Sequence, residues 1–360
     1  MGLDAVRVLA LVLVVAIHCD HWPNQTSGVN HTLWTSVDLV ARVCVPIFMV
    51  LSGFLLTYNR QRRMPLRTFA RRRLGRSLLP WAVWMPVYTV IGMYLTHEVT
   101  PTVSGVASWW ALGGGHLWYL LLIPQFYVVF QFWPVGRRAV IVVAVLALAF
   151  QIALDVYRLH APSTAPLNGF FLAHGYQVFF FWIGYFAVGT ALGVLVREHE
   201  GPLPPAWPFW LLTAAGVLVL LLANGSRTPN ASFAQGTGAF LLPVLPLATI
   251  AVFVAVGVSG GPGWAKRPAF AQVLRTLGRY ALGIYIVHEA LTYIPGPLQL
   301  IPFAQTHLLV ATPIFLFQVA VTLALAYMLT RLLAAGPLAI TIGLPPEPLR
   351  WSRWRRPLEV

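Results

Sequence analysis

The sequence predicts an all-α polytopic integral membrane protein with about ten transmembrane helices and both termini in the cytoplasm (N-in, C-in). Hydrophobic residues make up 58% of the 360 residues and charged residues only 9%, whereas about 25% of the residues in an average soluble domain are charged. The mean hydropathy is +0.73. A chain with so few charges cannot cover a water-facing surface, which excludes a soluble multidomain protein.

Ten apolar segments are long enough to cross a bilayer, which takes about 20 residues of helix. They span residues 3–20, 37–58, 77–95, 116–133, 139–157, 177–196, 207–223, 237–258, 278–294 and 307–333. Short connections that contain Pro and Gly separate many of them. We expect residues 1–335 to form one transmembrane domain and residues 336–360 to form a basic cytoplasmic tail.

The basic residues predict the orientation. The chain has 24 Lys and Arg against 10 Asp and Glu, which gives a net charge of +14. Eight arginines fall between Arg60 and Arg76, after the second predicted span, and most others fall in every second connection from there and in the tail. Cytoplasmic loops carry such an excess. The clustering therefore indicates an N-in, C-in topology and an anionic ligand, and a nucleic acid partner is not expected.

The cysteines and the histidines near the first span predict neither a disulfide nor a metal site. Cys19 and Cys44 lie in or beside apolar segments without a Cys-x-x-Cys spacing, which is typical of inert buried thiols. His18 and His21 have no clear third ligand nearby, so no metal is expected. The residues after His18 also lack the small side chains of a cleavage site, so residues 3–20 are expected to be a retained first span.

Ionisable residues inside a membrane span are costly, so each is a candidate for function. The first span carries Asp4, Arg7 and His18. Asp4 and Arg7 are one helical turn apart and close enough to pair. Arg7 and His18 share nearly the same helix face with an axial separation of roughly 16 Å. One stripe is therefore placed to hold the two ends of a long ligand.

The second span begins with another one-turn pair, Asp38 and Arg42. Further along, the small residues Ser52 and Gly53 allow a close helix approach. Ser52 also suggests a nucleophile, but the Gly-x-Ser-x-Gly elbow that exposes such a serine is absent. The charged pair is therefore the stronger functional candidate of this span.

The arginine loop ends in a candidate anion site. Topology and contact with anionic lipid explain most of this loop. Three of its arginines run into the next helix: Arg72, Arg73 and Arg76. Positive charge at a helix start is disfavoured unless an anion binds there. These arginines therefore predict a site for a phosphate-rich ligand that arrives from the cytoplasm.

Polar and aromatic side chains of the fourth and ninth spans complete the candidate site: His116, Trp118, Tyr119, Tyr285, His288 and Glu289. Trp118 and Tyr119 open the fourth span, where such residues commonly form an interfacial belt. In the ninth span Tyr285 and His288 share a helix face. Glu289 is an intramembrane carboxylate, which a partner or water must reach.

Five short motifs follow one another between residue 3 and about residue 333. They are Leu3-Asp4-Ala5-Val6-Arg7 with His18; Arg42 with Val45-Pro46-Ile47-Phe48 and Ser52-Gly53-Phe54; Arg73-x-x-Arg76 with Pro80; His116-Leu117-Trp118-Tyr119-Leu120; and Leu277-Gly278 through Tyr285 to His288. Together they resemble the signatures of the membrane acyltransferase-3 family, which O-acylates carbohydrates and other hydroxylated acceptors in bacteria.

The resemblance implies cytoplasmic acyl-CoA, with acetyl-CoA as the expected form, as the donor. Its phosphates would be held by Arg72, Arg73 and Arg76. Arg7 would lie along the route of the acyl arm, with Asp4 orienting it. His18 would act as general base on the acceptor hydroxyl or would carry the acyl group briefly.

The acceptor is reached within or across the membrane, and the residues expected near it are Arg42, Asp38, His116, Trp118, Tyr119, Tyr285, His288 and Glu289. A glycan, a lipid-linked sugar and a small secondary metabolite such as a macrolide all remain possible acceptors. The expected location is the bacterial cytoplasmic membrane.

Two other classes of protein compete with this interpretation. A non-catalytic transporter of a polysaccharide intermediate or a lipid explains intramembrane charges equally well, but it gives no reason for the Arg7 and His18 stripe beside an arginine cluster. A structural membrane scaffold has no use for buried charges.

Overall fold

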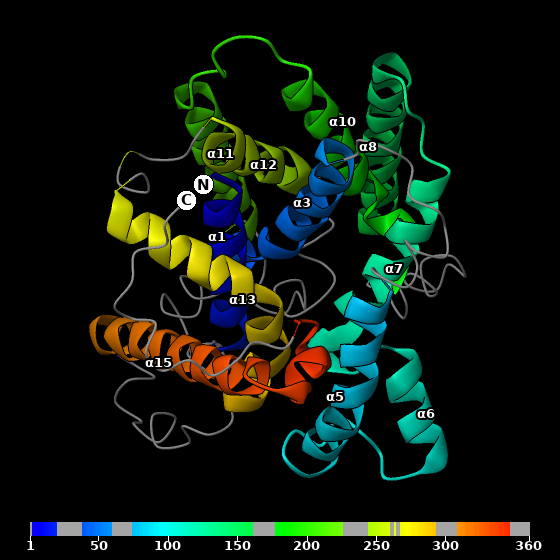
Figure 1. Cartoon of the computed structure of the whole chain (residues 1–360), viewed down its shortest axis with the longest axis vertical. Coiled ribbons are helices and arrows are strands. Elements are labelled where there is room, and N and C mark those ends of the chain that lie inside the picture. Colours follow the sequence, from blue (N-terminus) through cyan, green and yellow to red (C-terminus); the bar gives the residue numbers. More distant parts are fainter. Residues whose placement is uncertain are drawn as a thin grey trace.

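Helices form every regular element in the part of the chain that the structure describes (Figure 1). The computed structural model describes residues 2–19, 38–59, 74–160, 177–225, 244–259, 263, 267–292 and 308–345. The α-helices are α1 (Gly2–His18), α3 (Cys44–Tyr58), α5 (Gly75–Tyr94), α6 (Val103–Ala111), α7 (Trp118–Gln131), α8 (Arg137–His160), α10 (Ile183–Arg197), α11 (Trp207–Gly225), α12 (Val244–Phe253), α13 (Pro268–Thr292) and α15 (Leu308–Ala334). Short helical elements are η2 (Gly115–Leu117), η4 (Phe179–Phe181), η6 (Val254–Val258, a π-helix) and η9 (Pro337–Ile342). The all-α prediction is confirmed for these residues.

Each of the ten predicted spans overlaps one of the α-helices, with two larger differences. α6 fills the connection between the third and fourth predicted spans, and the Thr102 side chain caps it by accepting a hydrogen bond from the Gly105 amide at 3.1 Å. α13 begins at Pro268 instead of residue 278. Its added first turns are amphipathic, because Ala271 and Leu274 are buried while their neighbours face outward.

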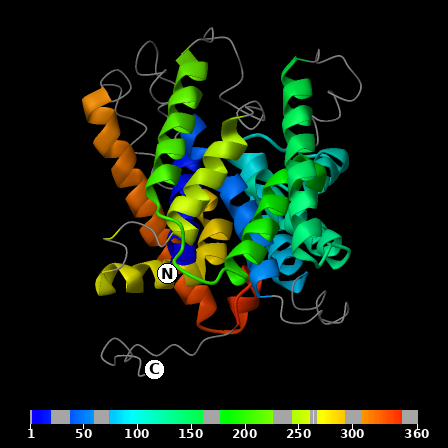
Figure 2. The same ribbon diagram turned by 90° about the horizontal axis from the view of Figure 1, so that it is seen from above.

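Several described helices are suited to a membrane. Three are long and apolar enough to cross one alone: Asp38–Tyr58, Arg137–Tyr157 and Thr312–Ala334. The pair α6 and η2–α7, bent by 45°, adds a fourth if it is counted as one span. Both Figure 1 and Figure 2 show α8 and α15 on opposite sides of the molecule, with other helices between them. These features fit a multi-pass protein, while the count of ten spans and the N-in, C-in orientation remain predictions.

α1 lies inside the bundle, where it packs against α3, α13, α15 and η6 (Figure 1). Leu11, at its middle, is completely buried. α1 and α13 run parallel, because Arg7 contacts Gly278 and, further along both helices, the His18 ring contacts the His288 ring. The first span is thus the central helix that carries the candidate stripe.

α3 and α10 pack closely because glycines face each other's backbones. A Cβ added to Gly53 would lie 2.2 Å from the carbonyl oxygen of Phe186. One added to Gly189 would lie 2.1 Å from the carbonyl oxygen of Val50. Small residues allow this approach, and in a bilayer close packing is what holds helices together. The close helix approach expected at Gly53 is therefore confirmed.

We predict that Gly189→Ala destabilises the bundle, because its methyl group forces the α3 and α10 backbones apart. Overpacking of this kind costs about 1–3 kcal/mol, and thermal unfolding in detergent measures it. Gly136→Ala is the matched control, since nothing lies within 4 Å of a Cβ added there. Equal melting temperatures for the two variants would contradict the prediction.

Candidate functional site

Three imidazole rings from distant parts of the chain meet at the end of α1. His18 ends α1, His116 lies in η2 and His288 lies near the end of α13. The His288 ring centre lies 5.0 Å from that of His18 and 5.0 Å from that of His116, while the rings of His18 and His116 are 5.7 Å apart. His116 and His288 are buried and His18 is half-buried. The structure therefore brings three separately predicted residues into one histidine cluster.

Three consecutive glycines place His116 in this cluster. Gly113, Gly114 and Gly115 have φ angles of 87°, 60° and 53°, in a region that costs residues with a Cβ roughly 1–2 kcal/mol each. A Cβ on Gly114 would also lie 2.5 Å from the Met85 sulfur. This left-handed turn leads the chain from α6 into η2, and the glycine run is a sequence signal that points to it.

Both ring nitrogens of His116 face oxygen atoms. Its Nδ1 forms a close ion pair with the Glu289 carboxylate. Its Nε2 lies 3.0 Å from the carbonyl oxygen of Tyr285 and 3.3 Å from that of Ile286. In return, the Tyr285 hydroxyl donates to the His116 carbonyl oxygen. Glu289 thus has the partner that an intramembrane carboxylate requires.

The two ring nitrogens of His288 have different surroundings. Its Nδ1 lies 2.7 Å from the carbonyl oxygen of Tyr285. Its Nε2 is buried and has no hydrogen-bond partner within the described residues. The surrounding turn of α13 is fixed by Tyr88, whose hydroxyl donates to the Ile286 carbonyl at 2.7 Å and accepts from the Ala290 amide at 3.2 Å. The sequence gives no sign of this role for Tyr88, since a lone Tyr in an apolar span resembles any core aromatic residue.

The two aromatic residues that open α7 have different surroundings. The Tyr119 ring lies 5.7 Å from that of Tyr285, and its hydroxyl hydrogen-bonds with the Ser52 side chain. The Trp118 ring stacks on that of Trp182 at 5.6 Å. Tyr119 therefore adjoins the histidine cluster through Tyr285, whereas Trp118 packs on the neighbouring span.

The other end of α1 carries the predicted ion pair. Nη1 of Arg7 lies 3.1 Å from Oδ1 of Asp4 and also donates to the carbonyl oxygen of Gly278 at 3.4 Å. A Cβ on Gly278 would lie 3.2 Å from the same carboxylate oxygen. Arg7 and His18 thus both face α13, which confirms the common stripe.

Arg76 lies in the exposed first turn of α5. A Cβ on Gly343 would lie 2.8 Å from the Arg76 carbonyl oxygen and 2.7 Å from Leu282 of α13. Leu282 follows Gly278 by one helical turn, so Arg76 belongs to the same end of the bundle as Arg7. Arg72 and Arg73 lie outside the described residues.

Asp38 and Arg42 form the second predicted pair. Nε of Arg42 lies 2.8 Å from Oδ2 of Asp38, and Asp38 is buried. The structure thus forms the predicted one-turn pair.

Glu98 is a further carboxylate near the cluster that the sequence does not single out. It lies in the connection between α5 and α6, next to His97, whose φ is 56°. Partial loss of hydration and repulsion from Glu289 raise the pKa of the Glu98 carboxyl above its usual value. A glutamate in a polar connection is ordinarily solvated, so its position alone gives no hint of this neighbour.

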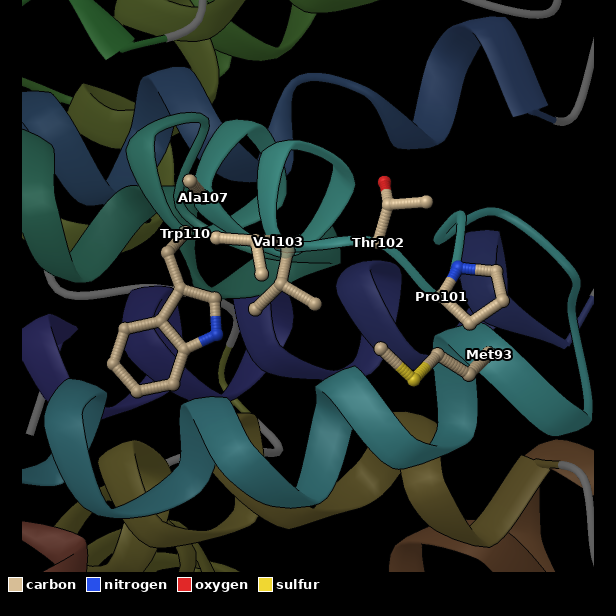
Figure 3. A pocket seen from close by; sticks show the side chains of 7 residues that line it. Met93, Pro101, Thr102, Val103, Ala107 and Trp110 are labelled. Carbon is tan, nitrogen blue, oxygen red and sulfur yellow. The ribbon is translucent and has the colours of Figure 1, made fainter.

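An open apolar pocket lies between α5 and α6 (Figure 3). Met93 of α5 and Val103, Ala107 and Trp110 of α6 line it. It contains no titratable side chain and so offers no chemistry of its own. Among the described residues, no three His, Cys, Asp or Glu side chains are arranged to hold a metal ion.

A family model described as an acyltransferase domain matches residues 2–331. No curated protein and no solved structure matches the chain. The matched region contains both ends of the α1 stripe and the whole histidine cluster.

We predict that His116 and Glu289 are energetically coupled, because each leaves the other unpaired when it is removed. His116→Phe and Glu289→Leu should each lower the free energy of unfolding by about 3 kcal/mol. The double variant should lose at least about 1 kcal/mol less than the sum, as a double-mutant cycle measures. The half-exposed pair Arg197 and Glu198 is the control, with a coupling below about 1 kcal/mol. Additive losses at His116 and Glu289 would contradict the pairing.

Proposed function

Because the chain belongs to the acyltransferase-3 family of membrane acyltransferases, we propose that it transfers an acetyl group from cytoplasmic acetyl-CoA to a hydroxyl group of a glycan or lipid-linked sugar. The observation that carries this proposal is the meeting of His18 with His116 and His288 at one end of α1, opposite Arg7 at the other. Membership of an enzyme family leaves no support for a non-catalytic transporter. The protein acts in the bacterial cytoplasmic membrane with its N-terminus inside.

The donor phosphates bind at the arginine end. Arg76 is exposed in the first turn of α5, and Arg72 and Arg73 precede it in the chain. Guanidinium groups match phosphate geometry with two parallel hydrogen bonds. Arg7, held by Asp4 and the Gly278 carbonyl, lies on the route between this end and His18.

His18 performs the transfer step. Its imidazole takes the proton of the acceptor hydroxyl as that oxygen attacks the thioester carbonyl, or it attacks the thioester itself and passes the acyl group on. His18 is half-buried while its two neighbouring histidines are buried, so it is the ring of the cluster that substrates reach. His116 and Glu289 support the site by holding the turn of α13 next to it.

The acceptor binds at the histidine end. Aromatic faces suit sugar rings, and Tyr119 and Tyr285 adjoin the cluster there. Trp118, on the neighbouring surface, and the pair Asp38 and Arg42 extend this region. A hydroxylated secondary metabolite such as a macrolide is the second class of acceptor that these groups suit.

We predict that His18→Ala abolishes transfer of label from acetyl-CoA to an acceptor, because general acid–base catalysis contributes about 10²–10⁴-fold in rate. The assay uses purified protein in liposomes, radiolabelled acetyl-CoA and a panel of glycans, lipid-linked sugars and macrolides. His160→Ala is the control, since that histidine is exposed and its Nδ1 lies 2.8 Å from the Val156 carbonyl oxygen of the same helix. Full transfer by His18→Ala would exclude its proposed role.

We predict that Arg76→Gln raises the KM for acetyl-CoA about tenfold, as expected for one lost phosphate contact, and leaves kcat nearly unchanged. Arg138→Gln, at the exposed start of α8, is the matched control and should leave KM unchanged. Acetyl-pantetheine lacks the nucleotide phosphates of the donor, so the wild type and the Arg76 variant should use it equally. An Arg76 effect that persists with this short donor would rule out a phosphate contact.

A further inference from the structure

Hydrogen-bond partners assign the proton of His288. Its Nδ1 lies 2.7 Å from a carbonyl oxygen, which can only accept, so Nδ1 carries the proton. Nε2 of the neutral ring is then an acceptor with a free lone pair. This atom is buried and without a partner among the described residues, in a side chain with 0% exposure. A buried acceptor without a partner is energetically costly, which indicates that a donor reaches it at some stage.

His116 cannot be that donor. Its Nε2 faces two carbonyl oxygens, and its Nδ1 faces the Glu289 carboxylate. Both nitrogens are therefore committed to oxygen acceptors. The Tyr88 hydroxyl is likewise committed, since it donates to the Ile286 carbonyl. The Tyr285 ring lies 5.9 Å from that of His288, but its hydroxyl donates to the His116 carbonyl.

His18 is the remaining ring neighbour, at a suitable distance. An N–H···N bond of about 2.9 Å between two imidazole rings puts their centres about 5 Å apart. The observed separation between the rings of His18 and His288 is 5.0 Å. The rings meet edge to face at 65°, so the bond requires the His18 ring to turn about its Cβ–Cγ bond.

We propose that His288 is a positioning residue for His18, an inference that rests on the proposed function. In the reactive state one nitrogen of His18 donates a hydrogen bond to Nε2 of His288. The other nitrogen faces the substrates with a free lone pair. His288 thereby selects the reactive tautomer of His18. The buried pair of His116 and Glu289 holds the α13 turn that carries His288.

When His18 acts as a base, the transfer is a direct attack of the acceptor oxygen on the thioester. The acceptor O–H bond breaks and its proton goes to the free nitrogen of His18, while the oxygen forms a bond to the acyl carbon. The C–S bond breaks and the thiolate of CoA leaves with the electron pair. The His18 imidazolium, still bonded to His288, then gives its proton to that thiolate.

If His18 instead carries the acyl group, its free nitrogen bonds to the acyl carbon while the C–S bond breaks and the thiolate leaves with the electron pair, and the N–H proton of His18 passes to Nε2 of His288. The acceptor oxygen then bonds to the acyl carbon as the N–acyl bond breaks, His288 returns its proton to His18, and the acceptor proton goes to the thiolate.

Three substitutions at position 288 test this role. His288→Gln places an amide oxygen near the position of Nε2, His288→Asn places one near Nδ1, and His288→Leu provides no acceptor. We expect kcat to fall about 100-fold or more in the Asn and Leu variants, with an unchanged KM for acetyl-CoA. The Gln variant should keep kcat within about tenfold of the wild type.

A purely structural role for His288 would give a different pattern. All three variants would then lose activity together with thermal stability, and that result, like full activity in all three, would overturn the proposal. Size-exclusion profiles and acetyl-CoA binding confirm that each variant is folded. If the wild type transfers no label to any acceptor, the proposed function fails. If it does transfer label, and this transfer depends on His18 but not on His288, only the inference about His288 fails.

Discussion

A charge or an imidazole inside a bilayer must find its partner within the protein, and the parallel contact of α1 with α13 is where this chain meets that requirement. At one end it gives Arg7 both Asp4 and a backbone carbonyl. At the other it brings His18 against His288. A shift of α1 by one residue would turn its side chains by about 100°, and both sets of contacts would be lost together. The polar groups therefore fix the register of a contact whose other residues are largely apolar.

Glycines make these contacts possible because they let backbones come within reach of polar groups. Gly278 leaves room for the Asp4 carboxylate, and Gly114 holds a left-handed conformation beside Met85. Gly189 faces the Val50 backbone instead of a polar side chain, and it lets the backbone of α10 lie directly on that of α3. Between helices in a bilayer such packing replaces the hydrophobic driving force that is available in water. Substitutions at these glycines are thus expected to act on the site through helix position.

Much of the site was predictable where it depends on one helix. Asp4, Arg7 and His18 share a face by helical period alone, and the structure keeps them on it. What periodicity cannot supply is contact between helices. That His116 reaches His288 depends on the turn at residues 113–115, and that Tyr88 supports α13 depends on where α5 packs. The helix α6 was missed because its start is set by a local cap instead of an apolar period of membrane length.

The charges near the two ends of α1 also orient the donor in the proposed reaction. The end with Arg7 and Arg76 is basic, whereas the histidine end carries the carboxylates Glu289 and Glu98. Entering in reverse, acetyl-CoA would bring its phosphates against these carboxylates, and like charges at short range in a low dielectric repel strongly. Its thioester would at the same time lie beside arginines, which cannot take the proton of the attacking hydroxyl group. In the proposed reaction the phosphates therefore stay at the basic end, and the acyl carbon is the part of the donor that would reach His18.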